Sequence, residues 1–410
     1  MPSFVTHLES AIDGTHLPAD QPQTLHKDRP LWVRYDLDGV RSTLTKDKLR
    51  DRAPTLWRYA ELLPPGECNP GDDDIVSLGE GMSPLLAAPR LGKHFGLTNL
   101  LIKDESVLPT GSFKSRGQAL AITMAHRFGI KRVAIPTAGN AGGAMAAYAA
   151  RAGMQSYVFM PEDTPIINQR EAALFGAKTF LVNGLITDCG RIVREGKEPM
   201  GWFDVSTLKE PYRIEGKKTM GLELAEQLNW KLPDVILYPT GGGTGLIGMW
   251  KAFAELAEIG FLESEKRPRM VAVQSDGCCP IVTAFENNER FATPHENAAT
   301  IASGLRVPAG VGDLMILDAI RGSHGLEIAV EEDRIIEWMH LATTSEGISL
   351  CPEAAACVGA LEQLTTAGWI APDEQVVLFN TGAAQKYVEA IDAELPTLDL
   401  SQPIDWDRIA

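Results

Sequence analysis

The chain has 410 residues, of which 44% are hydrophobic and 22% charged, so it is long enough for two closely associated domains with sizeable cores. Its 54 acidic residues outnumber its 38 basic residues, and the resulting net charge of -16 argues against nucleic acid or an anionic membrane as a partner. No apolar run reaches the length of a membrane-spanning helix, and residues 1–4 do not open a signal peptide, so we expect a cytoplasmic protein.

Residues 1–75 are expected to form an N-terminal arm. Prolines recur through this segment, which closes on an acidic turn at residues 71–74. Within it, residues 56–63 read LWRYAELL and are followed by Pro64 and Pro65. This pattern predicts a short helix that the two prolines end.

After residue 98, short apolar runs of strand length recur along the chain, at 100–102, 133–135, 157–160, 179–182, 235–238, 270–273 and 376–379. Helical stretches such as 116–128, 141–152 and 246–259 separate most of them. Strands that alternate with helices predict an α/β fold with mostly parallel sheets flanked by helices. In such sheets the chemistry lies in the loops that follow the carboxyl ends of the strands.

The first such loop is PTGSFKSRG, which carries Lys114 at the expected start of a helix. The positive end of the helix dipole disfavours an ammonium group there, which lowers the pKa of the amine and makes it a better nucleophile toward an aldehyde. The preceding turn of Gly111, Ser112 and Phe113 is expected to aim Lys114 inward. A surface position is the plain alternative for any lysine taken alone.

The second loop, PTAGNAGG, spans residues 136–143 between a strand and an alanine-rich helix. Backbone N–H groups at a helix N-terminus suit a carboxylate or another anion. Asn140 has an amide that can donate to a phenolate oxygen, and Thr137 has a hydroxyl that can donate to a substrate. A simple helix cap built from small residues explains the sequence of this loop equally well.

The third loop, PTGGGTG, holds four glycines within residues 241–245, between a strand and a helix. Glycines let the backbone wrap closely around a phosphate, and the helix start adds positive charge. The same region also satisfies the GxGxxG pattern of dinucleotide-binding proteins at Gly243, Gly245 and Gly248, so a nicotinamide cofactor stays open as an alternative. Against it, no acidic residue ends the strand at 270–273.

A fourth candidate is Thr381, which follows the last strand and has a hydroxyl that can hydrogen-bond a neutral ring nitrogen. The six cysteines form no CxxC pair, and adjacent Cys278 and Cys279 are expected to be reduced residues near the core. The eight histidines show no HxxxH spacing. No catalytic metal is therefore expected.

Taken together, these four stretches resemble the fold type II, or tryptophan-synthase-β-like, pyridoxal-phosphate enzymes, and within that group the chain is most similar to the threonine synthase family. The resemblance extends over roughly residues 76 to 392. It implies a cofactor in the cleft between two α/β domains, a small amino acid as substrate and a homodimer. It also implies a large domain of 76–117 with 220–395, a smaller mobile domain of 118–219 and a tail of 396–410.

The resemblance also assigns roles to individual residues. Lys114 would carry pyridoxal 5'-phosphate as a Schiff base, Asn140 would contact its phenolic oxygen, and Thr381 would lie at its pyridine nitrogen. The cofactor phosphate would be bound by Gly241, Gly242, Gly243 and Thr244. The substrate carboxylate would be held by Thr137, Ala138, Gly139 and Ala141, with Asn140 among them.

The chain departs from the threonine synthase pattern just after the lysine. Those enzymes commonly carry an acidic residue there, whereas this chain has Ser115, as in the SFKxRG of serine and threonine dehydratases. A hydroxyamino-acid dehydratase, or another replacement enzyme or lyase of this fold, is therefore the alternative activity. A catalytically silent relative would be expected to lack the lysine. Lys103, Arg116 and Arg306 are candidates for a substrate phosphate by charge alone.

Overall fold

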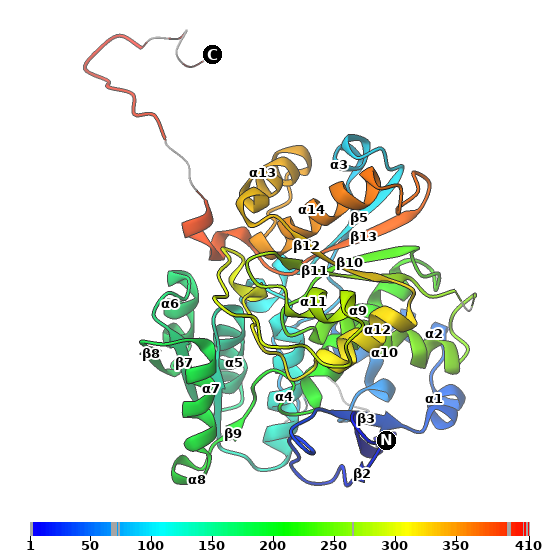
Figure 1. Ribbon diagram of the computed structural model, residues 1–410. Coiled ribbons are helices and arrows are strands. Elements are labelled where there is room, and N and C mark those ends of the chain that lie inside the picture. Colours follow the sequence, from blue (N-terminus) through cyan, green and yellow to red (C-terminus); the bar gives the residue numbers. More distant parts are fainter. Residues whose placement is uncertain are drawn as a thin grey trace.

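The computed structural model describes residues 3–66, 72, 74–264, 266–391, 395–404, 406 and 409. Three sheets organise this part of the chain: a six-stranded sheet, a four-stranded sheet and a three-stranded N-terminal sheet. Figure 1 shows the four-stranded sheet with its helices beside the larger α/β unit, and the N-terminal strands next to both.

The six-stranded sheet has the order β12-β11-β10-β13-β5-β4, and all its neighbouring pairs are parallel except β4 with β5. Its strands are β4 (Leu85–Ala87), β5 (Asn99–Asp104), β10 (Val235–Pro239), β11 (Arg269–Ser275), β12 (Leu326–Val330) and β13 (Gln375–Asn380). All five residues of the central strand β10 are buried, as expected for a parallel strand covered on both faces.

Helices cover both faces of this sheet. One face carries α9 (Tyr212–Gln227), α10 (Thr244–Glu258), α11 (Pro280–Glu286) and α12 (Asp313–Gly322). The other carries α3 (Pro89–His94), α13 (Ile335–Glu346) and α14 (Pro352–Thr366). Alternate residues of one strand enter the two cores: Ile236 lies in the first, and Val235 and Leu237 in the second.

The four-stranded sheet is parallel throughout, in the order β8-β7-β6-β9. Its strands are β6 (Arg132–Pro136), β7 (Gln155–Pro161), β8 (Lys178–Val182) and β9 (Phe203–Asp204). The helices around it are α4 (Lys114–Arg127), α5 (Asn140–Arg151), α6 (Ile166–Leu174), α7 (Ile186–Glu195) and α8 (Lys197–Met200). Helices α4, α5 and α6 share one core with this sheet, whereas α7 packs on the other side against Trp202 and Tyr157.

The predicted arm is more structured than its prolines suggested. β1 (Val5–Ser10) pairs antiparallel with both β2 (His16–Leu17) and β3 (Leu31–Tyr35), and buried Leu8 joins the core that includes α4. Two short helices follow, α1 (Leu37–Thr43) and α2 (Lys46–Arg50).

The short helix predicted at 56–63 is confirmed, and it is of the 3-10 type. Leu56–Leu62 form the 3-10 helix η1, which is interrupted at Tyr59 by non-helical backbone angles. All seven residues of η1 are buried, so packing rather than helix propensity sets the backbone there. Part of the predicted acidic turn, Gly71 and Asp73, lies outside the described residues.

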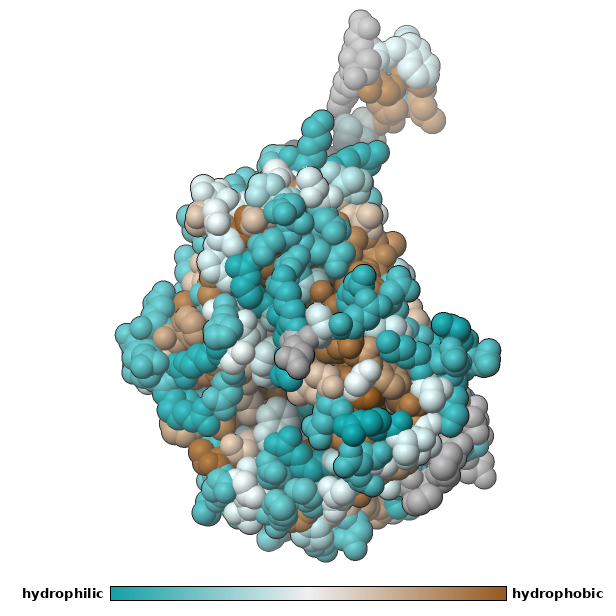
Figure 2. Space-filling view, turned by 90° about the vertical axis from the view of Figure 1, so that its right-hand side faces the viewer, coloured by the Kyte–Doolittle hydropathy of each residue, from teal (hydrophilic) through white to brown (hydrophobic). Residues whose placement is uncertain are grey.

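All seven predicted strands are confirmed, and the three predicted helices match α4, α5 and α10 within two residues at each end. No helix among the described residues combines the length and the apolar character needed to cross a membrane. Figure 2 shows one face of the molecule, on which hydrophilic residues predominate and apolar residues lie in small groups.

Candidate active site

The four loops selected from the sequence line one cavity. β5, β13 and β10 are neighbours in the large sheet, so the loops after their carboxyl ends meet, and the loop after β6 faces them from the small sheet. The cavity has a volume of about 390 Å³. Its lining includes every residue predicted for the site: Lys114, Thr137, Ala138, Gly139, Asn140, Ala141, Gly241, Gly242, Gly243, Thr244 and Thr381.

Lys114 is the first residue of α4, and its side chain enters the cavity lining. Burial, and then the positive charge of Arg213, lower the pKa of its amine to about 8, against the opposing influence of Glu353. Its Nζ lies 4.4 Å from the centre of the Phe113 ring, and no carboxylate among the described residues forms an ion pair with it. The neutral fraction of this amine near physiological pH is therefore much larger than that of an ordinary lysine, as a nucleophile or a base requires.

Backbone hydrogen bonds fix the lysine loop to the end of β13. The Phe113 N–H donates to the Thr381 carbonyl at 3.0 Å, and the Ala383 N–H donates to the Gly111 carbonyl at 3.0 Å. Thr110 and Gly111 both adopt left-handed backbone angles, with φ of 61°. The predicted turn before Lys114 is thus present, and it holds the loop that leads to Lys114 beside Thr381 in one wall of the cavity.

A second lysine lies beside the catalytic candidate. Lys217 on α9 is fully buried, its Nζ donates to the carbonyl of Phe113, and it lies 3.9 Å from the centre of the Phe113 ring. Burial, followed by the charges of Lys114 and Arg213, lowers its pKa well below the ordinary value. Lys217 does not line the cavity, so it supports the lysine loop from behind.

Asn140 begins α5 and links the small-sheet loop to the large sheet. Its Nδ2 donates to the hydroxyl of Tyr387 at 2.9 Å, and that hydroxyl donates to Glu353 Oε1 at 2.8 Å. The Asn140 Oδ1 is buried and has no hydrogen-bond partner in the part of the chain described. Such an orphaned buried acceptor in a cavity wall is the kind of group that a ligand satisfies.

The glycine-rich loop packs too closely against neighbouring residues to accept side chains. A Cβ on Gly241 would lie 2.3 Å from the Gly304 carbonyl oxygen, and one on Gly243 would lie 2.3 Å from Ile316. Gly243 also has φ of 68°, a backbone conformation that disfavours other residues. These glycines line the cavity just before α10 begins at Thr244, which is the arrangement of an anion site.

The GxGxxG pattern has a packing explanation. A Cβ on Gly245 would lie 1.9 Å from the hydroxyl of Tyr238, and one on Gly248 would lie 2.7 Å from the backbone nitrogen of Lys218. Gly248 thus permits the close approach of α9 and α10. The GxGxxG spacing of Gly243, Gly245 and Gly248 is therefore explained by packing, without a bound dinucleotide.

Thr381 is buried at the end of β13, with its hydroxyl 3.6 Å from the sulfur of Cys351. Burial raises the pKa of the Cys351 thiol well above its usual range, so both neighbours are neutral at physiological pH. Thr381 therefore offers the cavity a hydroxyl that neighbours an uncharged thiol.

The cavity is cationic although the protein is acidic. Four basic residues line it, Lys114, Arg194, Lys209 and Arg306, against the single acidic residue Glu353. Of the three residues considered for a substrate phosphate, Arg306 therefore lies at the cavity, where it also pairs with Asp163 at 2.7 Å.

The other two assignments, Lys103 and Arg116, are wrong. Arg116 is fully buried and donates to both carboxylate oxygens of Glu105 and of Glu223, and Lys103 is buried beside Glu223 at 3.3 Å. Both cations serve an internal ion network. Ser115 is likewise turned away from the cavity, and its hydroxyl donates to the Ser112 carbonyl at 3.0 Å.

Several lining residues escaped the sequence analysis, notably Arg194, Lys209, Ser303, Glu353 and Tyr387. None of them belongs to a loop directly after one of the predicted strands. Glu353 near the start of α14 follows a proline and a cysteine, and no motif marks it. Of the cysteines, Cys278 is buried and Cys279 half-buried, both without a disulfide as predicted, while Cys68 lies outside the described residues.

The fold and the site define a class of enzyme. A family model described as pyridoxal-phosphate dependent enzyme matches residues 76–382. The chain belongs to this family, and pyridoxal phosphate is its cofactor. The family match decides against the nicotinamide alternative.

Within the family, several relatives with similar sequences are named threonine synthase. The chain is 35% identical over 362 residues to the threonine synthase of Methanocaldococcus jannaschii, covering 88% of this chain and 87% of that protein. It is 34% identical to the threonine synthase of Methanosarcina acetivorans, covering 87% of this chain and 85% of that protein.

Solved structures confirm the tryptophan-synthase-β-like architecture that was predicted. Maize serine racemase superposes with a TM-score of 0.64 at 21% identity, covering 74% of this chain and 88% of that one. Diaminopropionate ammonia lyase from Escherichia coli superposes with a TM-score of 0.66 at 19% identity, covering 77% and 88%. At such identities the likeness concerns the fold alone.

Proposed function

We propose that this enzyme is a lyase that converts O-phospho-L-homoserine and water to L-threonine and phosphate. The observation that carries the proposal is the joint presence of a buried lysine, a glycine-rich anion loop and surplus positive charge in one cavity. Relatives named threonine synthase, matched over most of both chains, support the same activity.

The residues of the cavity fit pyridoxal phosphate. Lys114 would hold its carbonyl carbon, and the backbone N–H groups of Gly241, Gly242, Gly243 and Thr244 would hold its phosphate. Asn140 would face the phenolic oxygen, for which its Nδ2 has to leave Tyr387, and Thr381 would face the ring nitrogen. The fit rests on the glycine loop, which lines the cavity at the start of α10, and on the buried amine of Lys114, which lines the same cavity.

When bound, the cofactor supplies an electron sink for negative charge that develops at the substrate α-carbon. Lys114 Nζ would take the proton from that carbon, a role suited to an amine whose pKa of about 8 lies near working pH. Thr381 has a hydroxyl and no charge, so it would leave the ring nitrogen largely unprotonated. We infer that this restrains charge delocalisation and favours elimination and replacement over transamination.

Two parts of the cavity suit the two anionic groups of the substrate. Thr137, Ala138, Gly139 and Ala141 at the start of α5 would hold the carboxylate on backbone N–H groups. Arg194 and Lys209 lie on the same cavity, and Arg194 makes no ion pair with the described carboxylates. Together with Arg306 they would bind the departing phosphate and raise its local concentration in a protein of net charge -16.

We further propose that residues 118–219 form a domain that moves against residues 76–117 and 220–395 when substrate binds, with 1–75 as an arm and 396–410 as a tail. The cavity is lined from both sheets, so such a movement would close it. A homodimeric, cytoplasmic enzyme is proposed on family resemblance.

The activity is tested by incubating the purified enzyme with O-phospho-L-homoserine and measuring phosphate and L-threonine together. Equal amounts of the two products are expected. Serine and threonine are supplied in parallel, and 2-ketoacid is measured, because a dehydratase would produce it. Formation of 2-ketoacid from serine or threonine, with no phosphate released from O-phospho-L-homoserine, would contradict the proposal and support the dehydratase alternative.

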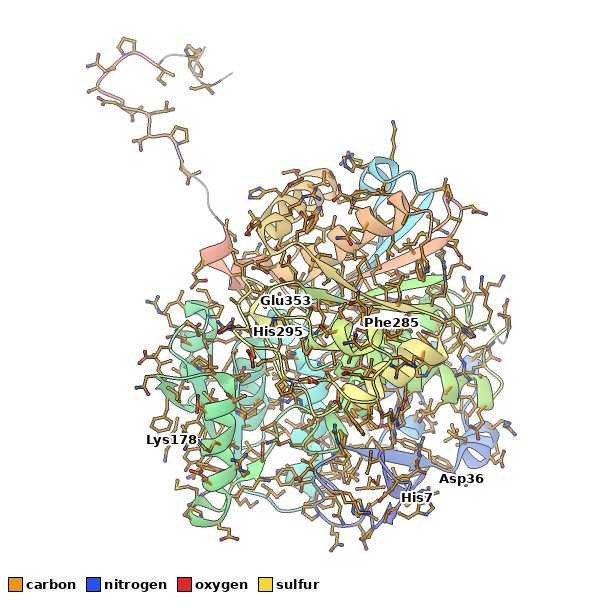
Figure 3. All side chains as sticks on the ribbon, in the orientation of Figure 1. His7, Asp36, Lys178, Phe285, His295 and Glu353 are labelled. Carbon is orange, nitrogen blue, oxygen red and sulfur yellow. The ribbon has the colours of Figure 1, made fainter. Side chains whose placement is uncertain are left out.

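Lys114→Ala and Lys178→Ala are a matched pair for this assay. Lys178 lies on β8, toward the outer side of the small sheet in Figure 3, and it does not line the cavity. Activity should be lost in Lys114→Ala and kept in Lys178→Ala. Full activity in Lys114→Ala would show that this lysine has no role in the reaction.

A further inference from the structure

Three side chains that suit a metal ion lie together on the N-terminal sheet. His7 and Glu9 are two residues apart on β1, so they share a face, and His16 on β2 is the direct cross-strand partner of Glu9. One ligand atom of each residue lies within 4.8 Å of the others. Figure 3 labels His7 among the N-terminal strands, in a different part of the molecule from Glu353 of the cofactor cavity.

The hydrogen bonds of Thr6 define the form of His7. The Thr6 hydroxyl has a single proton, and when it donates that proton to the carbonyl of Arg34 at 3.2 Å, the contact of 2.9 Å between Thr6 Oγ1 and His7 Nδ1 has Nδ1 as its donor. In a neutral imidazole the lone pair then lies on Nε2. This Nε2 atom is buried and has no hydrogen-bond partner among the residues that the structure describes.

Glu9 presents an oxygen to the same point. Its Oε1 accepts a hydrogen bond of 2.6 Å from Arg34, which fixes the carboxylate, and its Oε2 lies 3.8 Å from His7 Nε2. Two electron-rich atoms facing each other at this distance repel each other unless a proton, a water molecule or a metal ion lies between them, and a metal ion would satisfy both. The ring of His16 lies over that of His7, with 3.8 Å between ring centres, and brings a second imidazole to the same place.

We propose that His7, Glu9 and His16 bind one divalent metal ion of the zinc class, with water completing a tetrahedral shell. Zinc bonds of about 2.0–2.2 Å to nitrogen and oxygen separate neighbouring tetrahedral ligands by about 3.4 Å. The 3.8 Å pair must therefore contract by a few tenths of an ångström, and the exposed His16 side chain must close separations that reach up to 4.8 Å. Two imidazoles and one carboxylate match the ligand preference of this class, and Thr6 and Arg34 orient the ligands from outside.

The ion would reinforce a weak part of the fold. β2 has two residues and pairs with β1 through His16 and Leu17 alone, so the hairpin has little backbone ladder to hold it. A metal bond from His16 to two residues of β1 would join the strands directly. The site is structural and separate from the cofactor chemistry.

The test is equilibrium dialysis of the holoenzyme against micromolar Zn²⁺, with bound metal counted by atomic emission. The wild-type chain is expected to bind one ion at this site. His16→Ala and Glu9→Gln should each lower the affinity more than tenfold, and Thr6→Val, which removes an orienting partner, should lower it by about 10-fold to 100-fold. His26→Ala is the matched control, because His26 lies beside Asp13 in the same segment but outside the cluster.

Thermal unfolding gives the second readout, because a ligand that binds the folded state raises its midpoint. Zn²⁺ should raise the midpoint of wild type and His26→Ala and leave that of His16→Ala unchanged. His16 is exposed, so its replacement is compatible with folding. Absence of zinc binding by wild type, or equal binding by wild type and His16→Ala, would overturn the proposal.

Discussion

Gly243→Ala tests the assignment of the glycine-rich loop as the cofactor phosphate site. The substitution adds one methyl group at φ of 68° and places it 2.3 Å from Ile316. This distance is a collision, because ordinary van der Waals contacts begin at 3.4 Å. Ile316 is fully buried in the core beneath the loop, so it cannot swing into solvent. The loop itself is therefore expected to move.

The size of the effect follows from two contributions. The left-handed backbone costs roughly 1–2 kcal/mol for a residue other than glycine, and this cost falls on protein stability. A displaced loop also loses hydrogen bonds from its N–H groups to a phosphate, at about 1.5–3 kcal/mol for each bond to a charged group. Loss of two such bonds amounts to about 3–6 kcal/mol, which weakens cofactor binding at least about 100-fold.

Cofactor affinity is measured by titrating the cofactor-free protein with pyridoxal phosphate and following its visible absorbance. Gly260→Ala is the matched control, because Gly260 has φ of 75° just beyond the other end of α10 and nothing within 4 Å of an added Cβ. It carries the same backbone strain without a collision, and its affinity should equal that of wild type. Unchanged affinity in Gly243→Ala, or an equal loss in Gly260→Ala, would refute this assignment.

Two further predictions concern charge. Only the neutral amine of Lys114 attacks the cofactor, and the pKa of this amine is lowered to about 8. The rate of cofactor binding, measured by stopped-flow absorbance, should therefore increase with pH along a titration curve whose midpoint lies near pH 8. A midpoint near the ordinary value of 10.5 would contradict the lowered pKa. Arg116→Met leaves Glu105 and Glu223 without their main cation and should reduce the free energy of unfolding by about 3–5 kcal/mol in urea. Arg50→Met, which removes an exposed surface pair, should change it little, and equal losses would exclude the buried network as the cause.

The sequence predicted the strand-and-helix framework and the lining of the cavity because both have local signals. Strands such as 235–238 are continuous apolar runs, and the glycines of 241–245 are needed exactly where the chain turns from strand to helix. The carboxyl ends of parallel strands share an edge, which places the loops of Lys114 and Thr381 on one side of the sheet, and the family resemblance assigned both residues to one cofactor.

The remaining features depend on contacts between distant segments. Glu353 and Tyr387 meet Asn140 only in the folded chain, and Arg116 was mistaken for a ligand-binding residue because its partner Glu223 lies on another helix. The arm was assigned from its prolines, although pairing with β1 determines its structure. His16 lies opposite Glu9 through strand register, which a search for helical HxxxH spacing does not detect.

The central claim is that Lys114 holds the cofactor, and reduction with borohydride followed by peptide mass spectrometry tests it most directly. Reduction fixes pyridoxal phosphate to the amine that carries it. The account predicts that the added mass lies on Lys114 alone. A label on Lys217, the buried lysine on the other side of Phe113, or on any other lysine, would contradict it.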